Sequence, residues 1–453
     1  MTVDKGFMMN IGIIGAGIAG LAAALRLTKA GHQVTLYEGA PFLGGQASTF
    51  DVGGGRLEKG YHHLFTSDVD IIDLIEELGL TDRLAWIDSS VGIFHGGKIY
   101  DFITPKDLIK FKPLSLFSRI RLGLITLYLR RYKNWRSLEK YTASEWIKKY
   151  AGAGAYNVVW GPLLRGKFGS YFDKVGMPWL WGKMHTRFAS RGTGLKGMQS
   201  EKLGYPMGSF AEIFEELERK ITFAGGSINL STPVRDILIE NGQAKGVLIG
   251  DGDGKDVLEY HDKILSTTPS YIFDKLVPEL PDHYSYKLKN VDYLSAILVI
   301  LVLKRPFTNK YWLNIADRSI PFVGLIEQTN FVSPELYGGN KILYISNYLD
   351  ENNPLFHFSE SDLLEEYIPH LQKINPFFDK SWIEDWYYHK VSAAQPIIGK
   401  NYSERIPEHR TPIKNLYLAN TTQIYPEDRG TNYSVRMGNL VADLILEDVD
   451  SNA

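Results

Sequence analysis

The chain has 453 residues, of which 44% are hydrophobic and 23% charged, and its formal net charge is -2. Cysteine is absent, which excludes disulfides, thiolate metal sites and cysteine nucleophiles, and no other metal-ligand cluster stands out. The balanced charge excludes a general attraction to nucleic acid. No stretch of about 18 apolar residues predicts a transmembrane helix, so we expect a cytoplasmic protein.

The first 40 residues predict a βαβ unit. Residues 10–14 and 33–37 have the pattern of buried strands, and residues 18–30 have that of a helix ended by glycine. A Gly-x-Gly-x-x-Gly motif lies between the first strand and the helix, which is the context that dinucleotide binding requires. The loop residues expected to bind the dinucleotide are Gly15, Ala16, Gly17, Ile18, Ala19 and Gly20.

Each glycine of this motif has a physical purpose. Gly15 makes a tight turn, Gly17 lets the backbone approach a diphosphate, and Gly20 lets the helix pack closely on the strand. The diphosphate would lie at the helix N-terminus, where free N–H groups favour an anion. Glu38, at the end of the second strand, can accept hydrogen bonds from a ribose and would repel a 2'-phosphate. The unit therefore favours FAD or NAD over NADP.

The residues after Glu38 distinguish FAD from NAD. A second Gly-Gly turn follows directly, and the segment "EKGYHH" comes shortly after it. This pattern resembles the FAD-binding flavoprotein superfamily that contains amine oxidases, protoporphyrinogen oxidases and phytoene desaturases. The resemblance implies cofactor contacts at Gly44, Gly45, Gln46, Gly60, Tyr61 and His62.

Two later segments support the resemblance. Residues 204–268 read as a helix followed by several strands, and in this family Val234 would lie against the adenine through its backbone. Residues 412–447 read as a buried strand and a helix. In the family the N-terminus of that helix points at the flavin and stabilises negative charge on it. The residues that match this helix start are Gly430, Thr431 and Asn432.

The chain departs from the family pattern at two cofactor positions. Gln46 stands where the family usually has arginine, so one charged phosphate contact is lost. Asn420 and Thr421 stand where Gly-Asp or Gly-Glu usually binds the ribityl chain, which leaves Asn420 as the cofactor-binding residue there. The resemblance covers residues 10–65, 204–268 and 412–447.

These observations predict an α/β fold: a Rossmann-like FAD-binding domain of glutathione-reductase type, with an α+β substrate domain and a helical insert. Residues 295–303, 322–328 and 341–349 read as strands and residues 359–374 as a helix. The expected FAD-binding segments are 1–104, 204–285 and 396–453, the helical insert is 105–203, and the mixed sheet of the substrate domain is 286–395.

The helix at 115–133 allows two interpretations. Its apolar residues are interspersed with arginines, so it either packs on its own domain or rests on a membrane surface and admits a lipophilic substrate. The sequence does not separate these two interpretations.

The resemblance implies an FAD-dependent oxidoreductase that passes a hydride from a lipophilic or amine substrate to flavin N5. The expected catalytic residues are His62, Lys390 and Arg429, of which Lys390 falls where the family has a strand close to the flavin. Lys167 and Tyr433 are also candidates, Lys167 more as a surface or domain-interface residue. Two alternatives stay open: a non-redox flavin isomerase similar to UDP-galactopyranose mutase, and a non-catalytic binding protein with the FAD fold.

Overall fold

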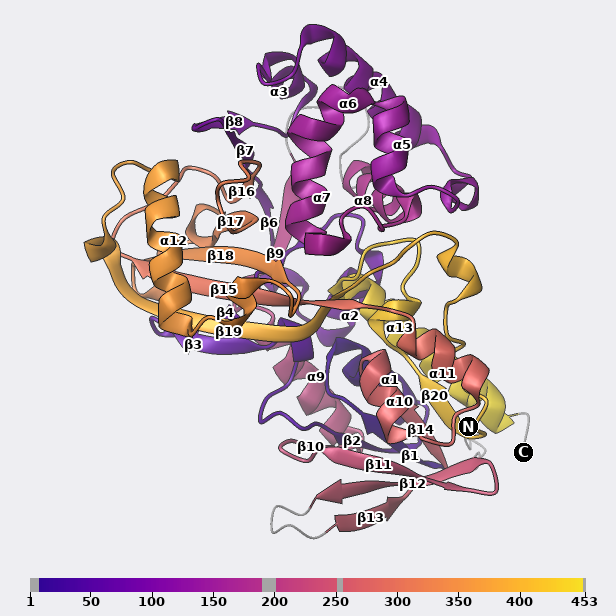
Figure 1. Cartoon of the computed structure of the whole chain (residues 1–453). Coiled ribbons are helices and arrows are strands. Elements are labelled where there is room, and N and C mark those ends of the chain that lie inside the picture. The colour runs from indigo at the N-terminus through magenta and orange to yellow at the C-terminus, as the bar shows by residue number, and fades with distance from the viewer. Residues whose placement is uncertain (1–7, 190–200, 251–255, 451–453) are drawn as a thin grey trace.

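A five-stranded parallel sheet joins segments from the two ends and the middle of the chain. The computed structural model describes residues 8–189, 201–250 and 256–450 (Figure 1). The strand order is β10-β2-β1-β14-β20, and every neighbouring pair is parallel. The strands are β1 (Asn10–Ile14), β2 (Gln33–Tyr37), β10 (Ser227–Asn229), β14 (Lys263–Ser266) and β20 (Leu416–Leu418).

Helices from both ends of the chain cover this sheet. The apolar run of β1 is buried because neighbours flank it on both edges and helices lie over it. The first helix and the last helix pack so closely that a Cβ added at Gly438 would lie 2.2 Å from the carbonyl oxygen of Ala19. The helices are α1 (Ile18–Lys29), α2 (Val69–Leu78), α9 (Ala211–Phe223) and α13 (Thr431–Asp450).

Smaller elements surround the parallel sheet. A three-stranded antiparallel sheet lies beside it at the bottom of Figure 1, and a short hairpin follows the second glycine turn. The antiparallel sheet has β11 (Val234–Glu240), β12 (Gln243–Gly250) and β13 (Asp256–Tyr260); the hairpin has β3 (Thr49–Val52) and β4 (Gly55–Glu58); α10 (Ser270–Leu276) and α11 (Asp282–Lys289) follow β14.

A seven-stranded mixed sheet forms the second large unit, in the order β19-β15-β18-β17-β16-β7-β8. Helix α12 (Glu360–Ile374) packs on one of its faces (Figure 1). The expected strands at 295–303, 322–328 and 341–349 and the expected helix at 359–374 are confirmed within a few residues. The strands are β7 (Val91–His95), β8 (Lys98–Asp101), β15 (Tyr293–Leu303), β16 (Trp312–Ile315), β17 (Gly324–Glu327), β18 (Lys341–Leu349) and β19 (Ile383–Pro396).

A helical region lies above the opposite face of this sheet (Figure 1). A small sheet of β5 (Leu64–Phe65), β9 (Lys202–Pro206) and β6 (Leu84–Asp88) connects it to the rest of the chain. The helices are α3 (Pro105–Lys110), α4 (Leu116–Arg131), α5 (Ala143–Tyr150), α6 (Gly152–Ala155), α7 (Gly161–Phe168) and α8 (Met177–Ala189).

Helix α4 exposes most of its apolar side chains. Only Leu122 and Leu129 are buried against the neighbouring helices, whereas Phe117 is 72% and Leu124 63% exposed. Packing on the protein's own domain therefore buries only a minor part of the apolar surface of this helix. The apolar face, defined by the exposed large side chains of α3 and α4, comprises Ile109, Leu116, Phe117, Ile120, Leu124, Leu127 and Tyr128. Among the described residues, no helix is both long and apolar enough to cross a membrane.

Candidate functional site

The first glycine loop has the geometry that its sequence predicts. Gly15 has a φ of +102°, which favours glycine. A Cβ at Gly20 would lie 2.1 Å from the carbonyl oxygen of Gly15, so only glycine lets α1 begin this close to β1. A Cβ at Gly17 would meet no atom within 4 Å. This open space beside the start of α1 is what the approach of a diphosphate to the backbone requires.

The second glycine turn packs directly on the first loop. The amide of Gly44 donates to the carbonyl oxygen of Ala16 at 2.9 Å, and Gly44 has a φ of +94°. A Cβ at Gly45 would lie 3.2 Å from the Cα of Gly17. The two turns therefore form one glycine-lined surface at the N-terminal end of α1.

Glu38 links this loop to the neighbouring strands. Its carboxylate accepts hydrogen bonds from the amides of Ala16 and Ala40, each at 2.8 Å, and its carbonyl oxygen accepts one from the amide of Thr232. Val234 begins β11 two residues later. The expected adenine-end residues therefore come from adjacent segments, and each carboxylate oxygen of Glu38 retains a lone pair for a ribose hydroxyl.

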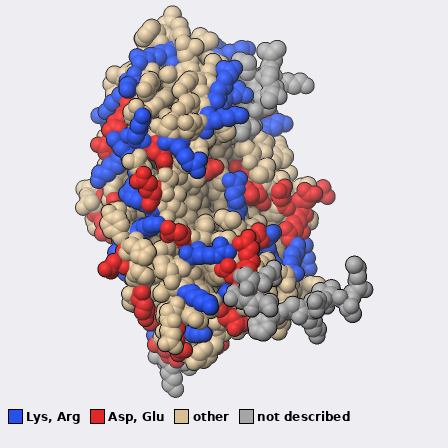
Figure 2. Space-filling model, turned by 90° about the vertical axis from the view of Figure 1, so that its right-hand side faces the viewer, with Lys and Arg blue, Asp and Glu red and all other residues tan. Residues whose placement is uncertain are grey.

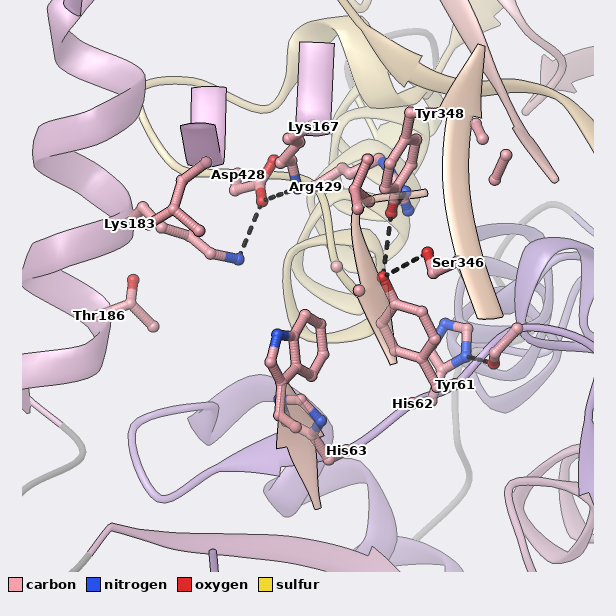
Figure 3. A pocket seen from close by; sticks show the side chains of 18 of the residues that line it. Tyr61, His62, His63, Lys167, Lys183, Thr186, Ser346, Tyr348, Asp428 and Arg429 are labelled. Atoms are coloured by element: carbon pink, nitrogen blue, oxygen red, sulfur yellow. Dashed lines mark hydrogen bonds and ion pairs between the residues drawn. The ribbon is translucent and has the colours of Figure 1, made fainter. Parts of the chain in front are cut away.

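The other end of the expected site is a cavity of about 350 Å³ (Figure 3). It lies between the seven-stranded sheet, helices α7 and α8, the segment after β4 and the start of α13. Segments almost 400 positions apart in the chain thus meet at one place. The sequence-predicted residues that line it are Gln46, Gly60, Tyr61, His62, Arg429, Gly430, Thr431, Asn432, Lys167 and Tyr433.

Lys390 does not lie at this cavity, so the prediction of a lysine beside the flavin is wrong in its geometry. In the register of β19 with β15, Lys390 is opposite Ile297, which packs toward α12, and Val391 is opposite Ala296, which lines the cavity. Because side chains alternate along a strand, Lys390 points to the α12 face. Its ammonium lies 3.2 Å from the ring centre of Phe356.

Asn420 also differs from its expected role, because contacts within the protein occupy its side chain. Its Oδ1 accepts from the amide of Thr422, and its Nδ2 donates to the carbonyl oxygen of Thr268 and to Ser270 Oγ. Asn420 is buried and does not line the cavity. Here the asparagine stabilises the turn after β20 rather than presenting a free polar group.

Asn432 lines the cavity and also ties two helices together. Its Oδ1 accepts a hydrogen bond of 3.1 Å from the amide of Ile71, in the first turn of α2. The free amides at the start of α13 stay directed toward the cavity end of this helix. The sequence-based expectation that this helix starts at the cavity is supported by the lining residues Gly430 and Thr431.

His62 is a neutral imidazole with a defined tautomer. Its Nδ1 lies 2.6 Å from the carbonyl oxygen of Gly60, so Nδ1 carries the proton and Nε2 is the acceptor. Burial lowers its pKa to about 4; the hydrogen bond to Gly60 opposes this shift, and the charge of Arg429 adds a smaller lowering effect. The neighbouring His63, which the sequence reasoning missed, bonds the hydroxyl of Tyr311, and burial lowers its pKa to about 3.

Arg429 is surrounded by neutral acceptors. It donates to Gln395 Oε1 at 3.2 Å, to Gln46 Oε1 at 3.3 Å and to the hydroxyl of Tyr348 at 3.4 Å. Burial would raise the pKa of Tyr348, but the charges of Arg429 and Lys167 and the hydrogen bond from Tyr61 together lower that pKa below its ordinary value. The hydroxyl of Tyr61, which lies 3.4 Å from that of Tyr348, keeps its proton because burial raises its pKa.

Asp428 accepts hydrogen bonds from side chains on the helical side of the cavity. Its Oδ2 accepts from Lys167 at 2.8 Å and from Lys183 at 3.1 Å, and its Oδ1 accepts from Trp179 Nε1 at 2.9 Å (Figure 3). Asp428 is 8% exposed, and although burial opposes ionisation, the two lysines keep its pKa far below the usual range. Lys167 is thus an interface lysine, as expected, but the interface faces the cavity.

The sequence contains a pattern for the helical side of the cavity that the sequence analysis did not recognise. Trp179, Lys183 and Arg187 recur at four-residue intervals in a helix of otherwise apolar character, and this spacing brings them to one face. All three line the cavity. Tyr348, Ser346 and Asp428 had no recognisable motif.

Comparison with known proteins agrees with the observed geometry. A family model described as "Flavin containing amine oxidoreductase" matches residues 18–446. The chain is 26% identical over 325 residues to the "Probable zeta-carotene desaturase" of Synechococcus elongatus, covering 66% of each chain, just under two thirds. It is 24% identical to the "15-cis-phytoene desaturase, chloroplastic/chromoplastic" of an Oncidium hybrid cultivar, covering 98% of this chain and 78% of that one.

The fold is also similar to that of solved structures. The crystal structure of a "Putative protoporphyrinogen oxidase" from Exiguobacterium sp. 255-15 superposes with a TM-score of 0.76 at 19% identity, over 98% of this chain and all of that one. At this level of identity the similarity concerns the mixed helix and sheet architecture.

Proposed function

The chain belongs to the family of flavin-containing amine oxidoreductases and is an FAD-dependent oxidoreductase; from this premise we propose that it oxidises a lipophilic substrate rather than an amine. The cavity carries this proposal. Its wall is largely aromatic and aliphatic, which suits an apolar substrate, and its cations would repel an ammonium group. The apolar side chains of this wall include Trp160, Leu163, Leu180, Met184, Leu298, Trp312 and Val323.

The residues present fit FAD in an extended arrangement. The open space at Gly17 and the adjacent Glu38 suit the diphosphate and ribose, with Val234 at the adenine end. The start of α13 and the segment around Tyr61 suit the flavin ring. On this proposal, residues 1–104, 204–285 and 396–453 form a Rossmann-like cofactor domain of glutathione-reductase type, and 105–203 and 286–395 choose the substrate. The expected boundary at 104 needs one correction, because β7 and β8 within the first segment pair into the seven-stranded sheet. When bound, FAD supplies the acceptor for a hydride and its two electrons.

The oxidation also requires an acceptor for a proton. A C–H bond that loses a hydride leaves a cationic carbon, and loss of a proton from the neighbouring carbon then forms a double bond. Tyr348 is suited to take that proton because nearby cations lower its pKa. His62 is neutral and presents an unprotonated Nε2, so it orients groups by accepting a hydrogen bond.

The apolar face of α3 and α4 supports contact with a membrane surface. Figure 2 shows blue side chains gathered over the upper, helical part of the molecule, beneath a cap of tan ones. Basic residues of α4 such as Arg130 and Arg131 flank the exposed apolar side chains. Apolar residues bordered by basic ones match an interface with anionic lipids.

The visible absorption spectrum of the purified protein tests this proposal. We expect a yellow flavin spectrum, photoreduction of that flavin, and turnover that depends on an added electron acceptor. Turnover that needs reduced flavin but consumes no acceptor would point to the isomerase alternative. Absence of a reducible flavin after incubation with FAD would leave only a non-catalytic binding protein.

A further inference from the structure

The helical wall of the cavity carries more positive than negative charge. Among the described lining residues, the cations are Lys167, Lys183, Arg187 and Arg429, and the carboxylates are Asp68 and Asp428. Arg187 is paired with the buried Glu201 outside the lining, so the surplus lies with the two lysines and Arg429. Both lysines share the single carboxylate of Asp428. One negative charge therefore faces two ammonium groups, and this positive surplus lies inside a cavity whose remaining wall is largely apolar.

Lys183 is the cation best placed to use that surplus. Its ammonium donates to Asp428 and points toward the middle of the space in Figure 3, and an ammonium group has two further N–H donors. Burial is the largest effect on its pKa, and it lowers that pKa together with the charges of Lys167 and Arg187, against the attraction of Asp428. A second negative charge at this point would relieve the repulsion between the cations.

The two sides of the cavity can be assigned to different tasks. Arg429 is directed toward Gln46 and Tyr348, at the end where the flavin segments meet. Lys167 and Lys183 come from α7 and α8, on the wall across from the sheet. An anion held by the lysines would thus be separate from the phosphates of FAD, which belong at the open space beside Gly17.

We propose that Lys183 and Lys167 bind the anionic head group of an amphiphilic substrate, a carboxylate or a phosphate, while its hydrocarbon part lies along the apolar wall. This inference rests on the proposed function and narrows its substrate class. The anion would anchor one end of the chain, so that the distance between the head group and the reacting carbon decides which bond is oxidised.

Binding of a matched series of ten-carbon amphiphiles to the FAD-loaded protein tests the inference. The series comprises decyl phosphate, decanoate, decanol and decylamine, each titrated calorimetrically below its critical micelle concentration. Because a charge-assisted hydrogen bond is stronger than a neutral one, we expect at least one anion to bind on the order of tenfold or more tightly than decanol. Decylamine should bind weakest. The comparison of decyl phosphate with decanoate identifies the preferred head group.

Two variants locate the effect. Lys183→Gln should lose on the order of tenfold in affinity for the preferred anion while its affinity for decanol stays the same. Lys174→Gln, which changes an exposed lysine between α7 and α8, should bind every ligand as the parent does. Equal binding of all four ligands, or an equal loss for decanol and the anions in Lys183→Gln, would overturn the inference. The flavin spectrum is recorded on the same samples, so failure of the proposed function is seen separately.

Discussion

At the scale of single residues, two cations of the cavity change the pKa of a neighbouring tyrosine. Arg429 and Lys167 lower the pKa of Tyr348 although burial works in the opposite direction. Tyr61 keeps its proton and lies 3.4 Å from the Tyr348 oxygen. A phenolate at Tyr348 would thus accept one hydrogen bond from Tyr61 and one from Arg429. Both bonds would stabilise Tyr348 in the deprotonated form that accepts a proton.

Replacing Tyr348 with phenylalanine tests this role. A base acts in its deprotonated form, so kcat/KM should rise with pH as Tyr348 loses its proton, at a pH below its ordinary pKa of 10.0. In Tyr348→Phe that rise should disappear and kcat should fall by about 10²–10⁴. Tyr388→Phe alters a tyrosine packed on the α12 side of the sheet and should keep the parent pH profile. A Tyr348→Phe enzyme with an unchanged profile would contradict the assignment.

Arg429 also bears on the departure at Gln46. The arginine that the resembled family has at position 46 is missing, but the guanidinium of Arg429 donates to Gln46 Oε1 from the other end of the chain. We expect Arg429 to supply the positive charge that Gln46 lacks. Arg429→Gln should weaken FAD binding by roughly 10–100-fold, the effect of one charge-assisted hydrogen bond, as measured by fluorescence titration of the apoprotein with FAD.

The exchange of the two side chains is the sharper version of this experiment. In the double variant Gln46→Arg with Arg429→Gln, the positive charge returns to position 46, and we expect affinity for FAD above that of Arg429→Gln alone. An Arg429→Gln protein that binds FAD as tightly as the parent would show that Arg429 does not contribute to the cofactor site.

At the scale of elements, the close contact of α1 with α13 brings together the two ends of the proposed cofactor site. A side chain at Gly438 would meet backbone rather than a movable side chain, so Gly438→Ala should cost about 1–3 kcal/mol of stability, read from denaturant unfolding. Gly123→Ala, in the exposed helix α4, meets only a side-chain carbon at 3.6 Å and should be neutral or slightly stabilising. Equal stability of both variants would contradict the packing argument.

Helix α4 is the element on which the membrane proposal depends. Replacing Phe117 and Leu124 together with serine removes two exposed apolar side chains, each expected to contribute about 1.5–3 kcal/mol when buried in lipid. Co-sedimentation with vesicles that contain anionic lipid should fall by at least tenfold. Phe377→Ser, at a residue 85% exposed just after α12, a helix that lies away from α4 in Figure 1, should sediment as the parent does. Parent protein that ignores such vesicles at low salt would refute the proposal.

Helices and strands could be predicted from the sequence where a local pattern determines the structure. The first βαβ unit and the strand at 341–349 were recognisable from periodicity, and the glycine loop was recognisable because its turn requires glycine. The exposed face of α4 was not recognisable, because an amphipathic pattern is the same whether the apolar side meets protein or lipid. Lys390 was misplaced because a shift of one residue along a strand reverses the face of the side chain.

At the scale of the whole molecule, the proposed cofactor site draws on three separate stretches of sequence, and the cavity is lined by segments that range from Gln46 to Tyr433. The parallel sheet brings the beginning, the middle and the end of the chain side by side (Figure 1). Motifs identified the proposed cofactor-binding stretches because each stretch has to fit one fixed chemical group of the cofactor. The lysines of α7 and α8 carry no such motif, since their role depends on contact with Asp428, which lies 261 residues from Lys167 and 245 from Lys183.

The most direct test of the account is anaerobic reduction of the bound flavin by candidate substrates. The oxidised flavin protein is mixed without oxygen with lipophilic polyenes and alkenes that carry a carboxylate or phosphate, and with amines of similar length, while the flavin absorbance is followed. The account predicts that an anionic lipophilic compound bleaches the flavin and is recovered with one additional double bond. Bleaching by amines alone, with the lipophilic compounds inert, would contradict it.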